Sequence, residues 1–353
     1  MADFRMAIIG YGGMGSWHHS SVKENVKSFE VVSAWDIREE ARENAKKNGV
    51  YTYSSLQELL DDKSIDLVTI AVPNNFHKEL TIACLQSGKN VICEKPVAMN
   101  AAELEDMMAA AKETGKLFSI HQNRRWDYDY CMIKKIIEDK TIGEPYFIES
   151  RVQGSRRSLH GWRGYKVNGG GMVYDWGVHL FDQLLDLFKC PVTEVSAHLF
   201  NVFSEDGVDD NFKVLLRFEN KVSAMVEIAT NCFINLPRWH MSCTDGTAII
   251  EDWELHGKIV KLSSDEIMTW DNDIVYTAAG PTRTMAPRPK HTVTELELPK
   301  VAPSWSEYYE NIAGVLKGEQ ELIVKPEQAL RVMHLIDTIF ESDRLGKPVE
   351  CSI

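Results

Sequence analysis

The chain has 353 residues, with 39 Lys and Arg against 52 Asp and Glu, so its formal net charge is −13. This length suggests about two domains, and 44% hydrophobic residues is ordinary for a soluble globular protein. An acidic balance repels phosphate groups, so we do not expect nucleic acid or a membrane surface as a partner. The seven cysteines form no C-x-x-C pair, and no apolar run resembles a leader or a membrane span. We therefore expect a cytoplasmic protein without a disulfide framework or a zinc ribbon.

The first third of the chain alternates strand-like and helix-like segments. Glycines 49, 88 and 115 follow three of the helix-like segments, as residues that end helices do. The alternation predicts βαβ units, and hence a Rossmann-type parallel sheet with helices on both faces, in a domain at 1–123. The strand-like runs are 6–9, 31–35, 66–72, 90–93 and 117–120, and the helix-like segments are 14–26, 38–47, 76–86 and 101–114.

After residue 123 the pattern changes to long β-rich stretches framed by helices. It predicts an α+β domain at 124–353 with a large open-faced, mainly antiparallel sheet. A free apolar sheet face is costly in water, so we expect a homodimer or homotetramer. Segment 270–290 contains three prolines and is predicted to be a loop. The predicted helices are 130–139, 172–188, 304–316 and 326–345, and the predicted strands are 146–152, 192–203, 212–218, 222–229, 239–244, 247–253 and 292–298.

The turn after the first strand carries the pattern G-x-G-x-x-G. Its glycines allow a tight turn and let backbone N–H groups approach a pyrophosphate at a helix N-terminus. The second strand ends in Asp36, at the spacing typical of a carboxylate that binds a ribose hydroxyl. A glycine turn without a ligand and a methylating enzyme are alternatives, but Asp36 and the second domain favour a dinucleotide. The predicted cofactor contacts of this region are Gly10, Tyr11, Gly12, Gly13, Met14, Gly15, Asp36, Ile37 and Arg38.

The residues at the end of the second strand also bear on the choice of cofactor. Asp36 would repel the 2′-phosphate of NADP, which favours NAD. Arg38 could offset that repulsion, so NADP stays an alternative.

A Glu94-Lys95-Pro96 motif ends the fifth strand-like run. Ligands of open parallel sheets bind beyond the carboxyl ends of the strands, so these side chains should face the binding crevice. Pro96 restricts the preceding Lys95 to an extended backbone. Taken alone, a lysine beside a glutamate is usually an ordinary surface ion pair.

A second motif runs from three glycines at 169–171 into a helix that carries Asp175 and His179. Residues four apart share a helix face, and a carboxylate there could orient an imidazole that removes a hydroxyl proton. Asp182 and Asp186 continue the polar stripe of Asp175 and His179 along this helix and raise the alternative of a metal site. No second histidine stands nearby at ligand spacing, which argues against a metal. A histidine held in a buried structural network is the remaining alternative.

In this order and combination, the motifs resemble the Gfo/Idh/MocA oxidoreductases, the group that contains glucose–fructose oxidoreductase and inositol 2-dehydrogenase. The resemblance covers nearly the whole chain and includes Val72-Pro73-Asn74 with His77. Segments 123–127 and 174–183 are most similar to the scyllo-inositol dehydrogenase branch. The resemblance implies an NAD(P)-dependent enzyme that oxidises a ring secondary alcohol of a sugar, glycoside or inositol to a ketone.

The resemblance also implies roles for individual residues. His179 would take the hydroxyl proton, Lys95 would hydrogen-bond the reacting oxygen, and Asp175 would position the substrate and the imidazole. Further cofactor contacts would be Pro73, Asn74, His77, Glu94, Lys95, Gln122, Trp162 and Arg163. The substrate contacts would be Lys95, Arg124, His160, Trp162, Asp175 and His179. A structural surface role is the alternative for the residues outside the catalytic set.

Segment 155–162 is rich in arginine, histidine and tryptophan, although the protein is acidic. Aromatic faces suit sugar rings and arginines suit hydroxyl groups, so the segment is a candidate wall of the substrate pocket. A solvated basic loop is the alternative. Two other functions also fit the family: a redox-neutral, NAD-dependent glycosidase, and a non-catalytic regulator that senses the dinucleotide. The complete set of Lys95, Asp175 and His179 argues against the regulator.

Overall fold

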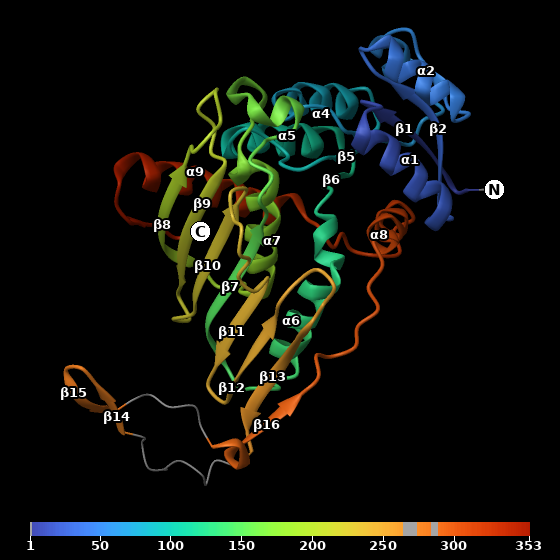
Figure 1. Cartoon of the computed structure of the whole chain (residues 1–353). Coiled ribbons are helices and arrows are strands. Elements are labelled where there is room, and N and C mark those ends of the chain that lie inside the picture. Colours follow the sequence, from blue (N-terminus) through green and yellow to red (C-terminus); the bar gives the residue numbers. More distant parts are fainter. Residues whose placement is uncertain (1, 264–273, 284–288) are drawn as a thin grey trace.

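A six-stranded parallel sheet forms the first part of the chain (Figure 1). The computed structural model describes residues 2–263, 274–283 and 289–353. The strand order is β3-β2-β1-β4-β5-β6, with parallel pairing throughout, which is the order of a dinucleotide-binding fold. All four residues of β4 are buried, as expected for a sheet covered on both faces. The strands are β1 (Phe4–Ile9), β2 (Phe29–Trp35), β3 (Tyr51–Thr52), β4 (Leu67–Ile70), β5 (Asn90–Cys93) and β6 (Phe118–Ile120).

The helix at Ala101–Thr114 begins and ends at residues with clear capping chemistry. The Asn100 side chain accepts a hydrogen bond from the Glu103 N–H, and Gly115 ends the same helix with φ 64°. The prediction of a parallel sheet covered by helices is confirmed, whereas β3 and the short α3 were not predicted. The helices are α1 (Gly13–Asn25), α2 (Glu39–Lys47), α3 (Leu56–Asp61), α4 (His77–Gln86) and α5 (Ala101–Thr114).

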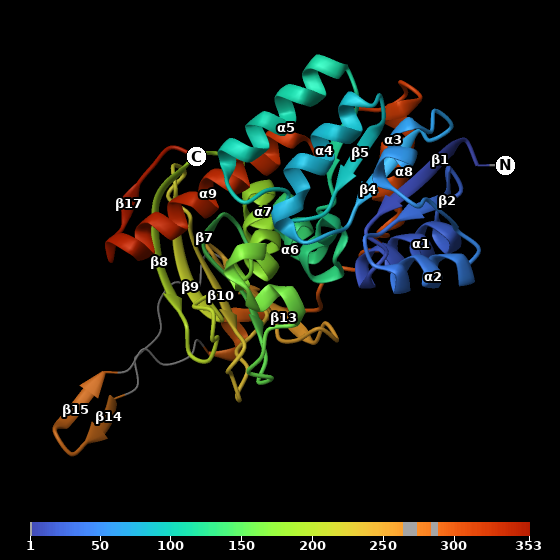
Figure 2. The same ribbon diagram turned by 90° about the horizontal axis from the view of Figure 1, so that it is seen from above.

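The second sheet has nine strands in the described residues, and only the β7–β10 pair is parallel. In β9, buried and exposed residues alternate strictly, so one face is covered and the other is open. Figure 2 shows α6, α7 and α9 on the covered face. The open-faced, mainly antiparallel sheet is thus confirmed. Its strands are β7 (Pro145–Gln153), β8 (Val192–Phe200), β9 (Asn211–Phe218), β10 (Ser223–Ala229), β11 (Trp239–Cys243), β12 (Gly246–Ile250), β13 (Gly257–Leu262), β16 (Val293–Leu296) and β17 (Val349–Glu350).

Helix α9 joins the two parts of the molecule, because it packs against β8 and α7 of the second part and against α5 and β6 of the first. Helix α8 packs against α1. The predicted helix at 172–188 is divided into a π-helical turn, η5 (Val173–Gly177), and α7 (Val178–Leu187). The division at residues 123 and 124 stays a proposal. The other helices are η2 (Asn123–Trp126), α6 (Tyr128–Glu138), η3 (Gly161–Gly164), η4 (Lys166–Asn168), η6 (Lys290–Thr292), α8 (Ser306–Leu316) and α9 (Pro326–Leu345), while η1 (Asn74–Phe76) precedes α4.

The prediction of a loop at 270–290 is wrong for residues 274–283. These form a hairpin of β14 (Ile274–Thr277) and β15 (Gly280–Arg283), which projects from the body in Figures 1 and 2. Gly280 has φ 112°, a conformation open to glycine, and so permits the tight turn between β14 and β15. The prolines of this segment had favoured the interpretation as a loop. Residues 270–273 and 284–288 of that prediction lie outside the described residues. Strand β13 was also missed.

Within the described residues, no helix combines the length and the apolar character that a membrane crossing requires.

Candidate active site

The glycine turn has the geometry that an anionic ligand needs. Gly10 has φ +89°, and a Cβ there would lie 2.4 Å from the Ala71 oxygen. A Cβ on Gly15 would lie 1.9 Å from the Gly10 oxygen, so only glycine lets α1 approach β1 this closely. Gly13 and Met14 are exposed, and the first turn of α1 holds no acidic residue. The open helix N-terminus therefore fits the pyrophosphate of a dinucleotide.

Asp36 braces the glycine turn from the end of β2. Its carboxylate accepts hydrogen bonds from the Tyr11 N–H and the Arg38 N–H, each at 2.8 Å. Oδ1 also accepts from the Arg38 Nε, whereas Oδ2 keeps a second lone pair for a ribose hydroxyl. Arg38 is 62% exposed at its side chain and lies 3.4 Å from the same carboxylate, next to exposed Ile37.

Lys95 and Asp175 meet between the two parts of the chain. The Lys95 Nζ donates to the Asp175 main-chain oxygen at 2.8 Å and to Oδ1 at 3.3 Å. The Arg163 Nε donates to the same Oδ1 at 2.9 Å. Burial alone would raise the pKa of Asp175, but Lys95 and Arg163 outweigh it and hold the pKa below its usual value. The site thus brings together an ionised carboxylate and two cations.

His179 lies on α7 beside this cluster and is 4% exposed. Burial, and then the positive charges of Lys95 and Arg124, hold the pKa of His179 well below its usual value. The imidazole is therefore neutral at neutral pH and able to accept a proton. Its Nδ1 is buried without a hydrogen-bond partner, and no hydrogen bond joins it to Asp175. The expected contact between carboxylate and imidazole is absent because the carboxylate is held by the two cations instead.

The acidic stripe that raised the metal alternative is occupied by ion pairs. Asp182 accepts two hydrogen bonds of 2.7 Å from the Arg125 guanidinium. Asp186 accepts from Tyr130 and from Lys134. These carboxylates support the fold below the site.

Asn74 and His77 lie behind the site and tie its loops together. The Asn74 Nδ2 donates to the Gly169 oxygen at 2.8 Å, joining the loop at Pro73 to the glycine segment. The fully buried His77 ring lies 2.8 Å from the Pro96 oxygen and 2.9 Å from the Val72 oxygen. Both side chains contact backbone around the predicted cofactor cleft.

The remaining predicted contacts differ in their surroundings. Gln122 is 2% exposed, and its Oε1 has no hydrogen-bond partner. The Arg163 guanidinium stacks 4.7 Å over the Trp162 ring, so Trp162 lies next to the Asp175 cluster. His160 is exposed, and its Nε2 lies 2.8 Å from the Arg156 guanidinium.

Arg124 lies beside two aromatic rings that contact each other, one of which also contacts His179. Its guanidinium carbon is 4.2 Å from the Trp176 ring centre and 5.9 Å from that of Trp253, and its NH1 donates to Asp127. The Trp176 ring lies 6.0 Å from the His179 ring. Trp253 stands in none of the motifs and is distant from Arg124 along the chain, so sequence reasoning missed it.

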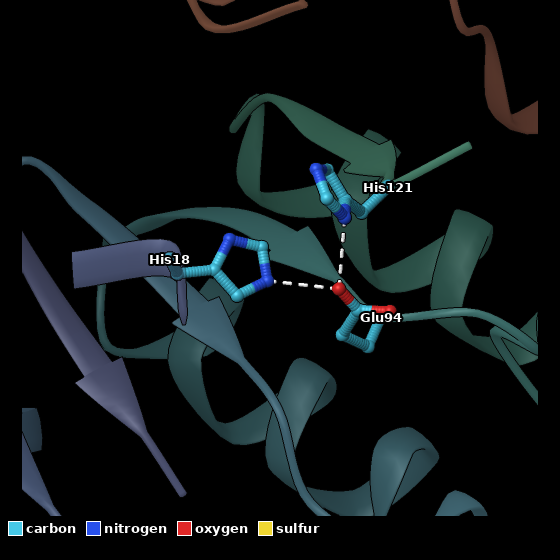
Figure 3. Close-up of side chains that lie close together, drawn as sticks. All are labelled: His18, Glu94 and His121. Atoms are coloured by element: carbon cyan, nitrogen blue, oxygen red, sulfur yellow. Dashed lines mark hydrogen bonds and ion pairs between the residues drawn. The ribbon is translucent and has the colours of Figure 1, made fainter. Parts of the chain in front are cut away.

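A buried network of two histidines around Glu94 was also missed (Figure 3). The Glu94 Oε1 lies 2.8 Å from both the His18 Nε2 and the His121 Nδ1, and the Tyr309 hydroxyl contacts the other nitrogen of His18. Burial alone would raise the pKa of Glu94, but the two histidines hold it well below its usual value. The Lys95 N–H donates to Oε2, so the network fixes the end of β5.

These three side chains bring ligand atoms within 4.8 Å of one another, a spacing that can hold a metal ion. The hydrogen bonds to Glu94 satisfy one nitrogen of each histidine without a metal. His18 donates from Nε2 and His121 from Nδ1, which leaves the His121 Nε2 as the buried acceptor without a partner. A metal at the centre would force a proton onto that nitrogen, where no acceptor faces it. We therefore interpret the cluster as a hydrogen-bond network.

Comparisons with known proteins agree with this geometry. The sequence model of an oxidoreductase family with an NAD-binding Rossmann fold matches residues 4–122, and that of the GFO/IDH/MocA C-terminal domain matches 130–249. Scyllo-inositol 2-dehydrogenase (NADP(+)) of Bacillus subtilis is 28% identical over 96% of this chain and 94% of its own. D-glucoside 3-dehydrogenase of Escherichia coli is 30% identical over 56% and 58%. The crystal structure of an NAD-binding protein from Listeria innocua is 42% identical, covers 99% of this chain and 97% of its own, and superposes with a TM-score of 0.87.

Proposed function

Because the chain belongs to the Gfo/Idh/MocA family of oxidoreductases, we propose that it transfers a hydride between NAD(P) and a ring secondary alcohol of a sugar, glycoside or inositol. The observation that carries the proposal is the pairing of Lys95 with Asp175 beside a neutral His179, between the nucleotide-binding sheet and the second domain. Relatives named for inositol and glucoside oxidation agree with this substrate class.

In the proposed reaction, the catalytic trio of Lys95, Asp175 and His179 divides the chemistry into three tasks. His179, kept neutral by burial and by Lys95, takes the hydroxyl proton onto its imidazole. Lys95 donates a hydrogen bond to the alcohol oxygen and stabilises the negative charge that grows there. Asp175, kept ionised by Lys95 and Arg163, orients the Lys95 ammonium. When bound, the dinucleotide supplies the acceptor for the hydride of the alcohol carbon.

For the cofactor, we propose NAD in preference to NADP. The Asp36 carboxylate stands where a 2′-phosphate would bring a second negative charge. Arg38 is exposed and adjacent, and the Bacillus subtilis relative is named for NADP(+). The chain's preference is therefore set by the balance of these two side chains.

The test mixes the enzyme with NAD⁺ or NADP⁺ and a panel of inositols, sugars and glycosides, and follows reduced nicotinamide. Steady formation of NADH from a ring alcohol is the expected result. Cleavage of a glycoside without net NADH would replace the proposal with a redox-neutral glycosidase. Binding of NAD without turnover of any compound would favour a dinucleotide-sensing regulator.

We also propose that the chain forms a homodimer or homotetramer through the open face of the nine-stranded sheet. On β9, Lys213, Leu215 and Arg217 point to this face, and Leu215 is 38% exposed. Burying such a face removes apolar area from water. Light scattering that finds only a 40.1 kDa particle at micromolar concentration would contradict this assembly.

We propose a cytoplasmic location, since all seven cysteines are free thiols. Secreted proteins of the oxidising compartments commonly pair theirs. Fractionation of cells that express the protein would test it.

A further inference from the structure

Arg124 also lines a cavity of about 690 Å³. Its walls come from α1, the start of α6, the segment after β12 and the segment before α8. Figure 1 shows the last of these running beside α6 toward α1. None of the predicted cofactor contacts lines the cavity, so it is a space additional to the nucleotide cleft.

Four tryptophans line this cavity, Trp17, Trp126, Trp253 and Trp305, and all but Trp126 are partly exposed. Trp253 is 47% exposed and Trp305 is 36% exposed, although each carries a large apolar surface. The Trp17 and Trp305 rings lie 5.4 Å apart at 64°, and Trp17 also packs on the His121 ring at 5.7 Å. Exposed aromatic rings gathered in a hollow mark a ligand site, and flat indole faces suit the C–H faces of a sugar ring.

The polar groups of the cavity suit hydroxyl groups. The Glu24 carboxylate on α1 is exposed and makes no hydrogen bond or ion pair with the described residues. The Arg124 guanidinium uses NH1 for Asp127 and has further N–H donors. Together the carboxylate and the guanidinium offer an acceptor and donors to vicinal hydroxyl groups. A purely apolar ligand would leave these polar groups without hydrogen bonds.

The cavity is joined to the catalytic trio through Arg124. The same guanidinium that borders the cavity lies 4.2 Å from the Trp176 ring, and that ring lies 6.0 Å from the His179 ring. Trp253 of the cavity also contacts Trp176, at 5.9 Å. A single-ring alcohol held at His179 would leave the cavity unused, whereas a molecule with a second ring would reach it past Arg124.

We propose that this cavity binds the second sugar ring of a two-ring carbohydrate, so that the enzyme oxidises disaccharides in preference to single-ring alcohols. The proposal rests on the dehydrogenase function proposed above and narrows its substrate class. Stacking on Trp305 and Trp17 holds the second ring, and Glu24 and Arg124 hold its hydroxyls.

The test compares methyl α- and β-D-glucopyranoside with maltose, cellobiose, trehalose and sucrose, using the full-length enzyme and its better cofactor. We expect at least one disaccharide to exceed both methyl glucosides at least tenfold in kcat/KM. In Trp305→Ala, that disaccharide should lose about tenfold in kcat/KM through a higher KM, while the methyl glucosides change less than twofold. Trp305→Phe should restore most of the loss. Tyr146→Ala, which removes a 58% exposed ring on β7, is the matched control and should change neither.

Calorimetric titration of the NADH-bound enzyme with the same sugars separates this proposal from the proposed function. A disaccharide that binds more tightly than methyl glucoside, and about tenfold more weakly to Trp305→Ala, supports the cavity even if no sugar is oxidised. Oxidation of methyl glucosides without a disaccharide preference would overturn the cavity proposal and leave the dehydrogenase standing. Equal losses in affinity or kcat/KM for one-ring and two-ring sugars in Trp305→Ala would also overturn it. So would a preference for phenyl glucoside, added to the same panel, over every disaccharide.

Discussion

The Lys95 ammonium lies 2.8 Å from the main-chain oxygen of Asp175 and 3.3 Å from its carboxylate. The contact joins residues 80 positions apart, one after β5 and the other in the π-helical turn before α7. Turns of π-helix are frequent at functional sites. Because the lysine side chain is only 14% exposed, this pair holds charge in a largely water-excluded place, where a hydrogen bond to a developing alkoxide is strong.

Replacing Lys95 tests this arrangement directly. Lys95→Met keeps the length of the side chain and removes the charge and the hydrogen-bond donors. We expect kcat to fall by about 10²–10³-fold, the range typical of removing a donor that stabilises a developing oxyanion, while the Kd for NADH changes little. Steady-state kinetics and fluorescence titration of NADH measure the two quantities.

The control for that variant is Lys78→Met, which removes a lysine paired with Asp106 on the surface. It should leave kcat within twofold of the wild type. A Lys95→Met enzyme with wild-type kcat would remove Lys95 from the reaction.

The pH profile reports on His179. Protonated His179 cannot accept the hydroxyl proton, so kcat/KM should fall as the pH falls through the pKa of this imidazole. That pKa is held well below its usual value by burial and by the charges of Lys95 and Arg124. Arg124→Gln removes one of those charges, which raises the pKa and moves the acidic limb of the profile to higher pH. An unchanged limb in Arg124→Gln would mean that His179 does not control it.

The fold was predictable where the sequence carries its own periodicity. Gly10 and Gly15 sit at positions where a Cβ would collide with backbone, and their spacing alone indicated the turn. By contrast, β13 and the hairpin of β14 and β15 lie in a segment without clear alternation. Strand β13 depends on its pairing with β12. The hairpin depends on the conformation of Gly280, which the nearby prolines led us to interpret as part of a loop.

The motifs named the candidate residues of the site but not the contacts between them. Lys95 and Asp175 were chosen from motifs, yet the spacing of Asp175 and His179 suggested a direct contact that Lys95 and Arg163 prevent. The network around Glu94 combines a residue of α1 with the residues that directly follow β5 and β6, and its histidines stand in no motif. Such networks depend on tertiary approach, which a single sequence does not record.

Cofactor choice should respond to the two charges at the end of β2. Asp36→Ser removes the carboxylate that opposes a 2′-phosphate, so the ratio of kcat/KM for NADP to that for NAD should rise by about tenfold or more, since one unfavourable charge contact is worth on the order of 1 kcal/mol or above. Arg38→Ala should lower the same ratio. A ratio unchanged in both variants would show that the cofactor's ribose does not reach this pair.

The buried pair of Arg125 and Asp182 should dominate stability below the site. Both side chains are nearly inaccessible, and two hydrogen bonds of 2.7 Å join them. Asp182→Ala leaves a buried guanidinium without its partner, and we expect the free energy of unfolding to fall by about 3–5 kcal/mol in urea titrations. The double variant Arg125→Met, Asp182→Leu should recover much of this loss. If Asp182→Ala unfolds at the wild-type urea concentration, the pair contributes no such stability.

The network around Glu94 should couple stability to pH, and His121→Phe isolates its contribution. Phenylalanine keeps the ring contacts with Trp17 and Tyr308 but removes the hydrogen bond to the Glu94 carboxylate. The pKa of Glu94 is depressed in the folded chain, so its stabilising effect is present above the ordinary carboxylate pKa and is lost as the pH falls through the folded value. With one donor removed, the depression is smaller and acid unfolding should begin at a higher pH. At pH 7 we expect a loss of about 1–3 kcal/mol, the usual cost of removing one partner of a buried charged hydrogen bond. Urea unfolding across a pH series, with the exposed His198→Phe as the control, measures both effects. An acid midpoint that does not move in His121→Phe would show that His121 does not hold the charge on Glu94.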